Sequence, residues 1–253
     1  MVEYRKVSIK MAKYEALGNT YLIEAFKDYN EEDLIYLAKY NQVNYILLYK
    51  EKPLELFTYD FNGKKVNLEA SGLSVLYGHL LREKIIEESP TYIFSDDEMY
   101  KLVMDDGLID VELPAPKLIK EYEHKDTLTI QDLNIHFTAL KLIDYHIIIY
   151  VNDEIESSWE YKNIERIFSH PLINKKFHIH LVKLYSYRKL EIKSYHKDYG
   201  WGKSISSGIA ASCYLSYLIN RMDNQIDVIT NKKLAKIRIY DERILIQSLI
   251  IKH

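Results

Sequence analysis

The sequence predicts an α+β protein made of two similar domains. Segments that alternate apolar and polar residues, as half-buried strands do, recur along the whole chain of 253 residues. Each half also carries one long segment with helical spacing of its apolar residues, and these segments open on Ser71-Gly72 and Ser207-Gly208. The length allows one large or two modest domains. Because the order of elements repeats after about half the chain, we expect two domains that face each other.

In the first half, strands surround one short and one long helix. The acidic start Asn30-Glu31-Glu32-Asp33 predicts a helix over 30–40. Apolar residues at helical spacing over 73–81 predict the long helix. Asn62-Gly63 and Asp106-Gly107 are typical of hairpin turns. The predicted strands of this half are 7–13, 20–26, 43–49, 54–60, 64–68, 92–94, 99–104 and 108–113.

The second half repeats this order after a stiff connection. Proline fixes φ and keeps the preceding residue extended, so Pro114-Ala115-Pro116 predicts a domain boundary just beyond it. We therefore expect domains over 1–120 and 121–242. A helix is expected near 161–168, and the second long helix follows Ser207-Gly208. The predicted strands of this half are 133–139, 147–151, 178–184, 190–195, 228–230, 235–240 and 244–251.

Composition excludes several classes of function. The 34 basic and 37 acidic residues give a net charge of −3, which does not attract nucleic acid or anionic membranes. No apolar run is long enough to span a membrane, and the first residues lack a signal-peptide pattern, so we expect a cytoplasmic protein. The one cysteine, Cys213, rules out an intramolecular disulfide and a multi-thiolate metal site. A homodimer stays open.

The two Ser-Gly helix starts are candidate binding elements. A helix N-terminus has unpaired N–H groups and the positive end of the helix dipole, so it attracts a carboxylate. Two such starts in facing domains would stabilise the carboxylate of a small substrate and the charge that develops when its α-proton leaves. The alternative is that each Ser-Gly pair is an ordinary helix cap.

Five motifs keep a familiar order and spacing over nearly the whole chain. They are Tyr14-Glu15-Ala16-Leu17-Gly18-Asn19, Asp60-Phe61-Asn62-Gly63, Leu68-Glu69-Ala70-Ser71-Gly72, Asp144-Tyr145-His146 and Asp198-Tyr199-Gly200-Trp201-Gly202-Lys203-Ser204-Ile205-Ser206-Ser207-Gly208. In these motifs the chain resembles the diaminopimelate epimerase family of cofactor-independent amino-acid racemases and epimerases. The resemblance implies that each domain is a curved sheet around a central helix, with the active site in the cleft between the domains. It also implies that the final strand, 243–253, returns to the first domain and that no cofactor is used.

The chain departs from this family at the residues that carry its chemistry. In the family, two cysteines, one before each central helix, act as base and acid on opposite faces of the α-carbon. Alignment places Glu69 and Ser207 at these positions, and Ser71 where the family has asparagine. Cys213 lies inside the second long helix, where we expect it to act as a small buried hydrophobe.

Site residues follow from the resemblance, position by position. The catalytic candidates are Glu69, Ser207 and His146. Asp198-Tyr199 stands in place of a glutamate-arginine pair, and His178 in place of a strand asparagine. The expected ligand is a small amino acid or a related carboxylate. The substrate-binding candidates are Asn19, Asp60, Ser71, Gly72, Asp144, His178, Asp198, Tyr199 and Gly208.

Two opposing effects decide whether Glu69 serves as a base. Burial raises the pKa of a carboxyl group toward neutrality, whereas a helix N-terminus lowers it. Ser207 has no base beside it in the sequence, which disfavours a two-base racemase and leaves a one-base isomerase or tautomerising proton shuttle. The related phenazine-biosynthesis isomerase family uses a glutamate in this way, although its glutamate aligns nearer Asn67.

Two hypotheses from different classes therefore stay open. The first is a divergent isomerase with Glu69 as base, and the second is a catalytically inactive descendant that binds a ligand or partner. A metal-dependent enzyme is a third reading, because His178 and His180 point to the same side of a predicted strand. With no third ligand identified, we expect no metal.

Overall fold

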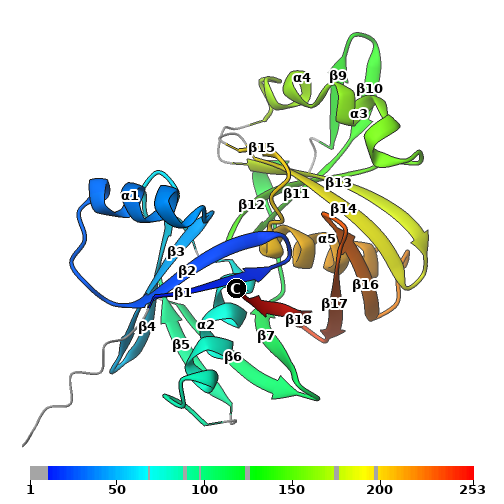
Figure 1. Ribbon diagram of the computed structural model, residues 1–253. Coiled ribbons are helices and arrows are strands. Elements are labelled where there is room, and N and C mark those ends of the chain that lie inside the picture. Colours follow the sequence, from blue (N-terminus) through cyan, green and yellow to red (C-terminus); the bar gives the residue numbers. More distant parts are fainter. Residues whose placement is uncertain are drawn as a thin grey trace, which may run out of the picture.

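The protein consists of two lobes of similar build, one from each half of the chain (Figure 1). The computed structural model describes residues 11–67, 69–87, 90–96, 98–122, 126–173, 177–196 and 199–253. Strands make up most of the chain, and the longest helix of each half, α2 in the first and α5 in the second, lies against the strands of its own lobe. The predicted α+β class with two similar domains is confirmed.

The first half begins with a hairpin and ends with a three-stranded meander. Its elements are β1 (Ala12–Ala16), β2 (Asn19–Ala25), α1 (Glu31–Asn41), β3 (Tyr45–Glu51), β4 (Leu54–Asp60), α2 (Ala70–Arg82), β5 (Thr91–Ser95), β6 (Glu98–Asp105), β7 (Leu108–Pro114) and β8 (Lys117–Leu118).

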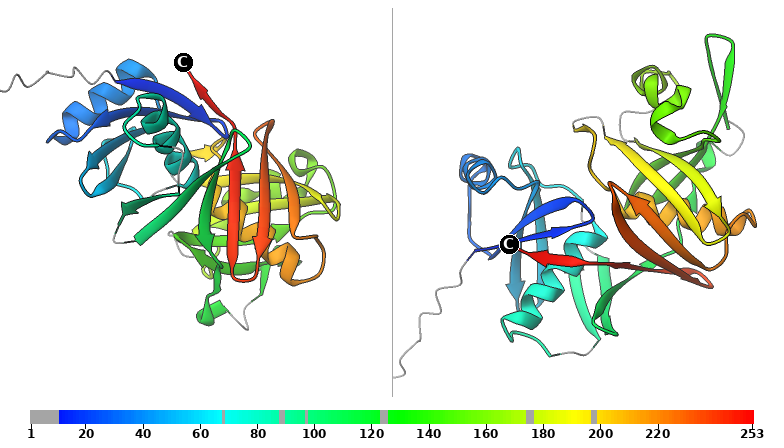
Figure 2. Two further views of the ribbon diagram at one scale, coloured as in Figure 1. Left: turned by 90° about the horizontal axis from the view of Figure 1, so that it is seen from below. Right: turned by 45° about the vertical axis from the view of Figure 1, so that its right-hand side comes forward.

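The second half adds a separate two-stranded sheet, β9–β10, and two short helices at the far end of its lobe (Figure 2). Its elements are a 3-10 turn η1 (Lys120–Tyr122), β9 (Thr127–Ile130), β10 (Leu133–His136), β11 (Thr138–Leu142), β12 (Asp144–Tyr150), η2 (Ile155–Ser157), α3 (Trp159–Lys162), α4 (Ile164–Phe168), β13 (Phe177–Ser186), β14 (Lys189–His196), β15 (Gly200–Trp201), α5 (Ser206–Leu218), β16 (Gln225–Thr230), β17 (Lys233–Tyr240), β18 (Arg243–Ser248) and β19 (Ile250–Lys252).

Strand pairing follows the same sequence of steps in both halves. An antiparallel hairpin, β1–β2 or β11–β12, is followed by a parallel step, β2–β3 or β12–β13. An antiparallel pair, β3–β4 or β13–β14, is followed by a second parallel step, β4–β5 or β14–β16. The meanders β5–β6–β7 and β16–β17–β18 complete each half. The internal repeat is therefore one of topology as well as of sequence.

The two halves also exchange strands. β8, which follows the first meander, pairs with β11 of the second half, and β19, which follows the second meander, pairs with β1 of the first. Between them β7 pairs with β18, so one sheet runs through both lobes (Figure 2). Main-chain hydrogen bonds therefore fix the orientation of one lobe relative to the other.

Both long helices are buried around most of their circumference. Residues 70–77 of α2 and 206–216 of α5 are all buried, which is the pattern of a helix enclosed by sheet rather than one lying on a surface. Small side chains allow this close packing. A Cβ on Gly208 would lie 2.1 Å from Cε1 of His180, so only glycine fits at that point of α5.

Several predicted elements differ in extent. No strand forms over 64–67, because Oδ1 of Asp60 accepts the backbone N–H groups of Asn62 and Lys64 and curls the chain after β4, leaving a single bridge to Lys65. Leu68 and residues 7–10 of the first predicted strand lie outside the described residues. The predicted strands 133–139 and 244–251 are each divided in two, and the predicted helix 161–168 becomes α3 and α4. Within the described ranges, no helix is long and apolar enough to cross a membrane.

The close approach at Gly208 predicts a large effect of Gly208→Ala. The buried ring of His180 is held by hydrogen bonds at both nitrogens and cannot move aside, so we expect a loss of about 1–3 kcal/mol of unfolding free energy in urea denaturation.

Gly78→Ala in α2 is the matched control. Its Cβ would lie 3.3 Å from the flexible ends of Ile109 and Ile250, and alanine favours helix, so we expect a change within about 1 kcal/mol. Equal effects of the two substitutions would contradict the packing at Gly208.

Candidate active site

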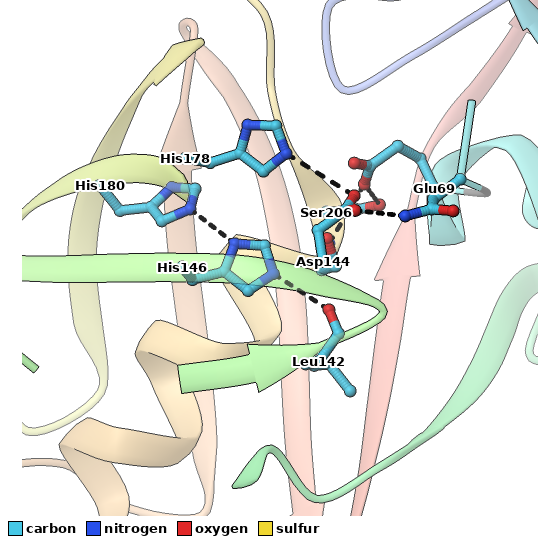
Figure 3. Close-up of polar contacts among 9 residues, drawn as sticks. Glu69, Leu142, Asp144, His146, His178, His180 and Ser206 are labelled. Atoms are coloured by element: carbon cyan, nitrogen blue, oxygen red, sulfur yellow. Dashed lines mark hydrogen bonds and ion pairs between the residues drawn. The ribbon is translucent and has the colours of Figure 1, made fainter. Parts of the chain in front are cut away.

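α2 and α5 begin side by side, and the start of each helix is capped by a side chain from the other. Glu69, directly before α2, makes no capping bond to its own helix, and Ile205, directly before α5, has no polar side chain to offer. Instead, Oε2 of Glu69 accepts the hydroxyl of Ser206 at 2.6 Å and the backbone N–H of Ser207 at 3.2 Å (Figure 3). The backbone N–H of Ser71 in turn donates to Oγ of Ser206 at 3.2 Å.

Glu69 is a buried carboxyl group with a pKa raised to about 7. Desolvation by burial is the main cause, and the negative charge of Asp144 adds to the rise. The hydrogen bonds from Ser206 and Ser207 and the charge of His178 act in the opposite direction and are outweighed. Burial therefore outweighs the hydrogen bonds that Glu69 accepts at the start of α5.

A cavity of about 430 Å³ lies between the halves, with Glu69 in its wall. No described residue hydrogen-bonds to the second oxygen of Glu69, Oε1, so that oxygen is available to a ligand. The first half contributes Tyr45, Lys65, Val66, Asn67 and Glu69, and the second contributes Asp144, Tyr145, Phe177, His178, His196, Tyr199, Lys203 and Ile205.

Asp144 and His178 lie against each other on this wall. Nε2 of His178 lies 3.6 Å from Oδ2 of Asp144 (Figure 3). The side-chain amide of Asn67 donates to Oδ1. Burial raises the pKa of Asp144, but the contacts with His178 and Asn67 outweigh it and hold the pKa below its ordinary value. Asp144 is therefore an ionised group whose oxygens are both occupied.

Aromatic rings stand in a row between this pair and Lys203. The ring of His178 stacks on His196 at 4.7 Å between centroids, and His196 stacks on Tyr199 at 4.2 Å. Nζ of Lys203 then lies 3.4 Å from the centroid of the Tyr199 ring. The row lines one side of the cavity and holds Tyr199 in place.

His146 lies behind the cavity wall in a chain of neutral groups. Because the carbonyl of Leu142 can only accept, Nε2 of His146 donates to it at 3.0 Å, and Nδ1 must accept from Nε2 of His180 (Figure 3). Nδ1 of His180 then accepts the hydroxyl of Ser194. Burial lowers the pKa of His146 to about 4 and that of His180 well below its ordinary value, so both rings stay neutral near pH 7.

The structure brings together four of the predicted site residues at the cavity: Glu69, Asp144, His178 and Tyr199. Asp198 lies outside the described residues. The other candidates, which do not line the cavity, are Asn19, Asp60, Ser71, Gly72, His146, Ser207 and Gly208.

The contacts of these other candidates are mostly with the fold. The side-chain amide of Asn19 donates to the carbonyl of Ser204 at 2.7 Å, and the hydroxyl groups of Ser71 and Tyr21 form a hydrogen bond. Ser207 gives Glu69 its backbone N–H, while its buried hydroxyl has no partner among the described residues. Gly72 and Gly208 lie inside α2 and α5.

Comparison with known proteins places these features in context. No family model matches the chain. Its sequence is 23% identical over 243 residues to a diaminopimelate epimerase of Pelagibacter ubique (strain HTCC1062), with 88% of each chain covered. Its fold is similar to that of a phenazine biosynthesis PhzC/PhzF protein of Clostridium difficile (strain 630), with a TM-score of 0.68, 11% identity and 97% of each chain covered. The chain is a distant member of the diaminopimelate epimerase/PhzF-like superfamily.

A further solved member of this superfamily fold is a hydroxyproline epimerase from Agrobacterium vitis, with bound trans-4-hydroxy-L-proline. It has a TM-score of 0.65 and 10% identity, and the match covers 95% of this chain and 88% of that one.

The present protein has a single cysteine, Cys213, which is buried in α5, and burial raises the pKa of its thiol. Neither helix start therefore carries a thiol.

The sequence analysis missed two residues of the candidate site in the present protein. Ser206, not Ser207, supplies the hydroxyl to Glu69, because α5 begins one residue earlier than the Ser-Gly pattern suggested. Lys203 stood in the last of the five motifs without a role assigned to it, yet it lines the cavity. Its position directly after Gly200-Trp201-Gly202, in a motif carried by the resemblance, was the available signal.

No group of three or more metal-ligating side chains comes together in the part of the chain that the structure describes. The clustered histidines do not form a metal site, because the ring nitrogens of His146 and His180 make hydrogen bonds to Leu142, to Ser194 and to each other.

The raised pKa of Glu69 predicts that it makes the protein less stable as pH rises. Between pH 4.5 and about 7 the folded state keeps a proton that the unfolded state has lost, so unfolding free energy falls over this range, by about 3 kcal/mol in total. Glu69→Gln keeps an acceptor for Ser206 and Ser207 but does not titrate. The stability of the wild type relative to this variant should therefore fall by that amount from acid to neutral pH.

Urea denaturation of both proteins across this pH range measures the difference. Glu51→Gln, at an exposed position, is the control and should run parallel to the wild type. A pH-independent difference between the wild type and Glu69→Gln would show that Glu69 ionises normally.

Proposed function

We propose that this protein catalyses cofactor-independent proton transfer on a small amino acid or related carboxylate bound in the cavity, with Glu69 as the base. The observation that carries the proposal is the position of Glu69: a carboxyl group with a pKa of about 7, in the wall of the cavity, with one oxygen fixed and the other available. A base with a pKa near the working pH is the most effective.

The proton transfer uses Glu69 and the residues that hold it. Oε1 of the ionised Glu69 takes a proton from a carbon next to a carbonyl or carboxylate of the ligand, and the electron pair of the broken C–H bond moves onto that group. The protonated Glu69 then returns the proton, to the same carbon or to a conjugated one. Ser206 and Ser207 hold Oε2 throughout, so the carboxyl group does not rotate between the two steps.

A single base favours return of the proton on the face from which it left. Inversion at one carbon requires a second acid on the opposite face. The hydroxyl of Ser207, at the second thiol position, is buried without a partner in the described structure and does not line the cavity. An unassisted hydroxyl is a poor acid or base at neutral pH. We therefore favour double-bond migration or tautomerisation over racemisation.

The second candidate is a catalytically inactive descendant that binds a ligand or partner. Its support is the loss of both thiols together with the capping role of Glu69, since that role alone would keep a glutamate at this position. The structural likeness to an epimerase with bound trans-4-hydroxy-L-proline supports a small ligand under either candidate.

Isotope exchange separates the two candidates. The protein is incubated in D₂O with a panel of amino acids and of 2-oxo and unsaturated carboxylates, and loss of the C–H signal is followed by NMR. We expect exchange with at least one compound, reduced about a hundredfold or more in Glu69→Gln, because general bases contribute rate factors of that order. If no compound exchanges hydrogen faster with the wild type than with Glu69→Gln, the enzyme hypothesis is wrong.

The hydroxyl of Ser206 should set the pH at which exchange begins. Exchange requires ionised Glu69, so its rate should rise with pH through about 7 and then level off. The Ser206 hydrogen bond lowers the pKa of Glu69, so in Ser206→Ala the midpoint should move to higher pH. Ser212→Ala removes a buried hydroxyl of the same helix that has no described partner, and its midpoint should not move. A common shift in both variants would point to a general disturbance of α5.

A further inference from the structure

Lys203 places a buried amine at the cavity without a partner. Its side chain lies in a cage of three rings, with Nζ 3.4 Å from the centroid of Tyr199, 4.8 Å from Phe61 and 5.1 Å from Tyr45. Nζ is buried, and no described residue hydrogen-bonds to it. Rings attract an ammonium group but do not neutralise its charge. A buried ammonium group without an anion is costly, which makes Lys203 a ready partner for a negatively charged ligand.

Asp60 is the acidic group whose charge acts on Lys203, but it does not hydrogen-bond to Nζ, and its oxygens accept other donors. Oδ1 of Asp60 accepts the backbone N–H groups of Asn62 and Lys64 at 2.9 and 3.0 Å. Oδ2 accepts the hydroxyl of Tyr199 at 2.7 Å. Asp60 thus positions the ring that lies against Lys203 without itself pairing with the amine.

The other cation of the cavity wall that carries a permanent charge is already paired. Lys65 lies 2.8 Å from Oδ1 of Asp96 and its side chain is 52% exposed. The carboxylate of Asp144 is paired with His178. Within the described lining, Lys203 is therefore the one unpaired cation, and Glu69, the base, is the one acid without a basic partner.

We propose that Lys203 is the anion receptor of the cavity and that the ligand is a small carboxylate without an ammonium group. This rests on the proposed function only in taking Glu69 as the base. A ligand carboxylate would give Nζ the charged hydrogen-bond partner that the chain does not supply. An α-ammonium group would find no free carboxylate except Glu69, and pairing there would occupy the base. The site is thus suited to an oxo acid or an unsaturated acid rather than to a zwitterionic amino acid.

Ionisation of the cavity groups agrees with this assignment. Burial lowers the pKa of Lys203 to about 8, against the opposing charge of Asp60, so the amine is still mostly protonated at pH 7. The titratable groups around the cage and cavity are Tyr45, Asp60, Lys65, Glu69, Asp144, Tyr145, His178, His196 and Tyr199. Carboxylate binding should weaken as pH rises through about 8, whereas ionisation of Glu69 requires pH above about 7.

Three aromatic ligands test the charge requirement directly: benzoate, its neutral isostere benzamide, and the larger zwitterion L-phenylglycine. Dissociation constants are measured by NMR titration of the protein near neutral pH. We expect benzoate to bind about tenfold or more tightly than the other two, as charged hydrogen bonds contribute that much. In Lys203→Met, which keeps the length and apolar contacts of the side chain, the preference of benzoate over benzamide should disappear.

The preference for benzoate is a ratio of two constants in one protein, so a general loosening of the fold does not remove it selectively. Lys65→Met is the matched control, at a lysine of the same wall that already has an acidic partner, and should change the ratio less than about threefold. An equal loss in both variants, a preference that survives Lys203→Met, tighter binding of phenylglycine, or no binding of benzoate would each overturn the assignment.

The preference for benzoate over benzamide does not depend on catalysis. Glu69→Gln should keep the preference for benzoate, because Lys203 and its cage are unchanged. If the preference depends on Lys203 but no carboxylate exchanges hydrogen in D₂O, the receptor assignment stands and the proposed function fails. If exchange occurs with amino acids and does not depend on Lys203, the proposed function stands and the receptor assignment fails.

Discussion

Oε2 of Glu69 joins the two halves of the protein at the point where both buried helices begin. A helix start leaves several N–H groups without partners, and in a dry interior each of them needs an acceptor. Here the acceptor for α5 comes from the residue before α2, and the acceptor for Ser71 of α2 is the hydroxyl of Ser206. Because the two caps are reciprocal, neither helix start is satisfied without the other. The same requirement buries a carboxylate at the seam and raises its pKa.

The exchanged strands hold this arrangement in place. β8, β19 and the β7–β18 pair connect the halves through main-chain hydrogen bonds, so the walls of the cavity do not depend on side chains alone for their spacing. Two groups of side chains then complete the cavity wall. The row of rings from His178 to Tyr199 forms a rigid wall, and the neutral chain from His146 to Ser194 fills the space behind it without adding charge. Charge is left at a few defined atoms that face the cavity.

Much of this could be read from the sequence, and the parts that could not have physical reasons. Alternation, turn residues and the two Ser-Gly starts sufficed for the fold class and the repeat, because they report local periodicity. The role of Ser206 depended on a one-residue difference in where α5 begins, which local patterns do not resolve. His146 stood at a motif position, yet whether its ring faced the cavity depended on packing against His180. The pKa of Glu69 required knowing its burial, and the isolation of Lys203 required knowing that the oxygens of Asp60 were taken.

Strand exchange also has a consequence for the order of folding. β1 lies near the beginning of the chain, but its edge partner β19 consists of residues 250–252. During synthesis on the ribosome, the first lobe therefore keeps an open sheet edge until residues 250–252 have emerged, and the N-terminus of α2 lacks its partner until Ser206 has emerged. Contacts across such long sequence separations fold slowly, and open edges invite pairing with other chains. Most of the first lobe's sheet can form early, but its completion is coupled to that of the second.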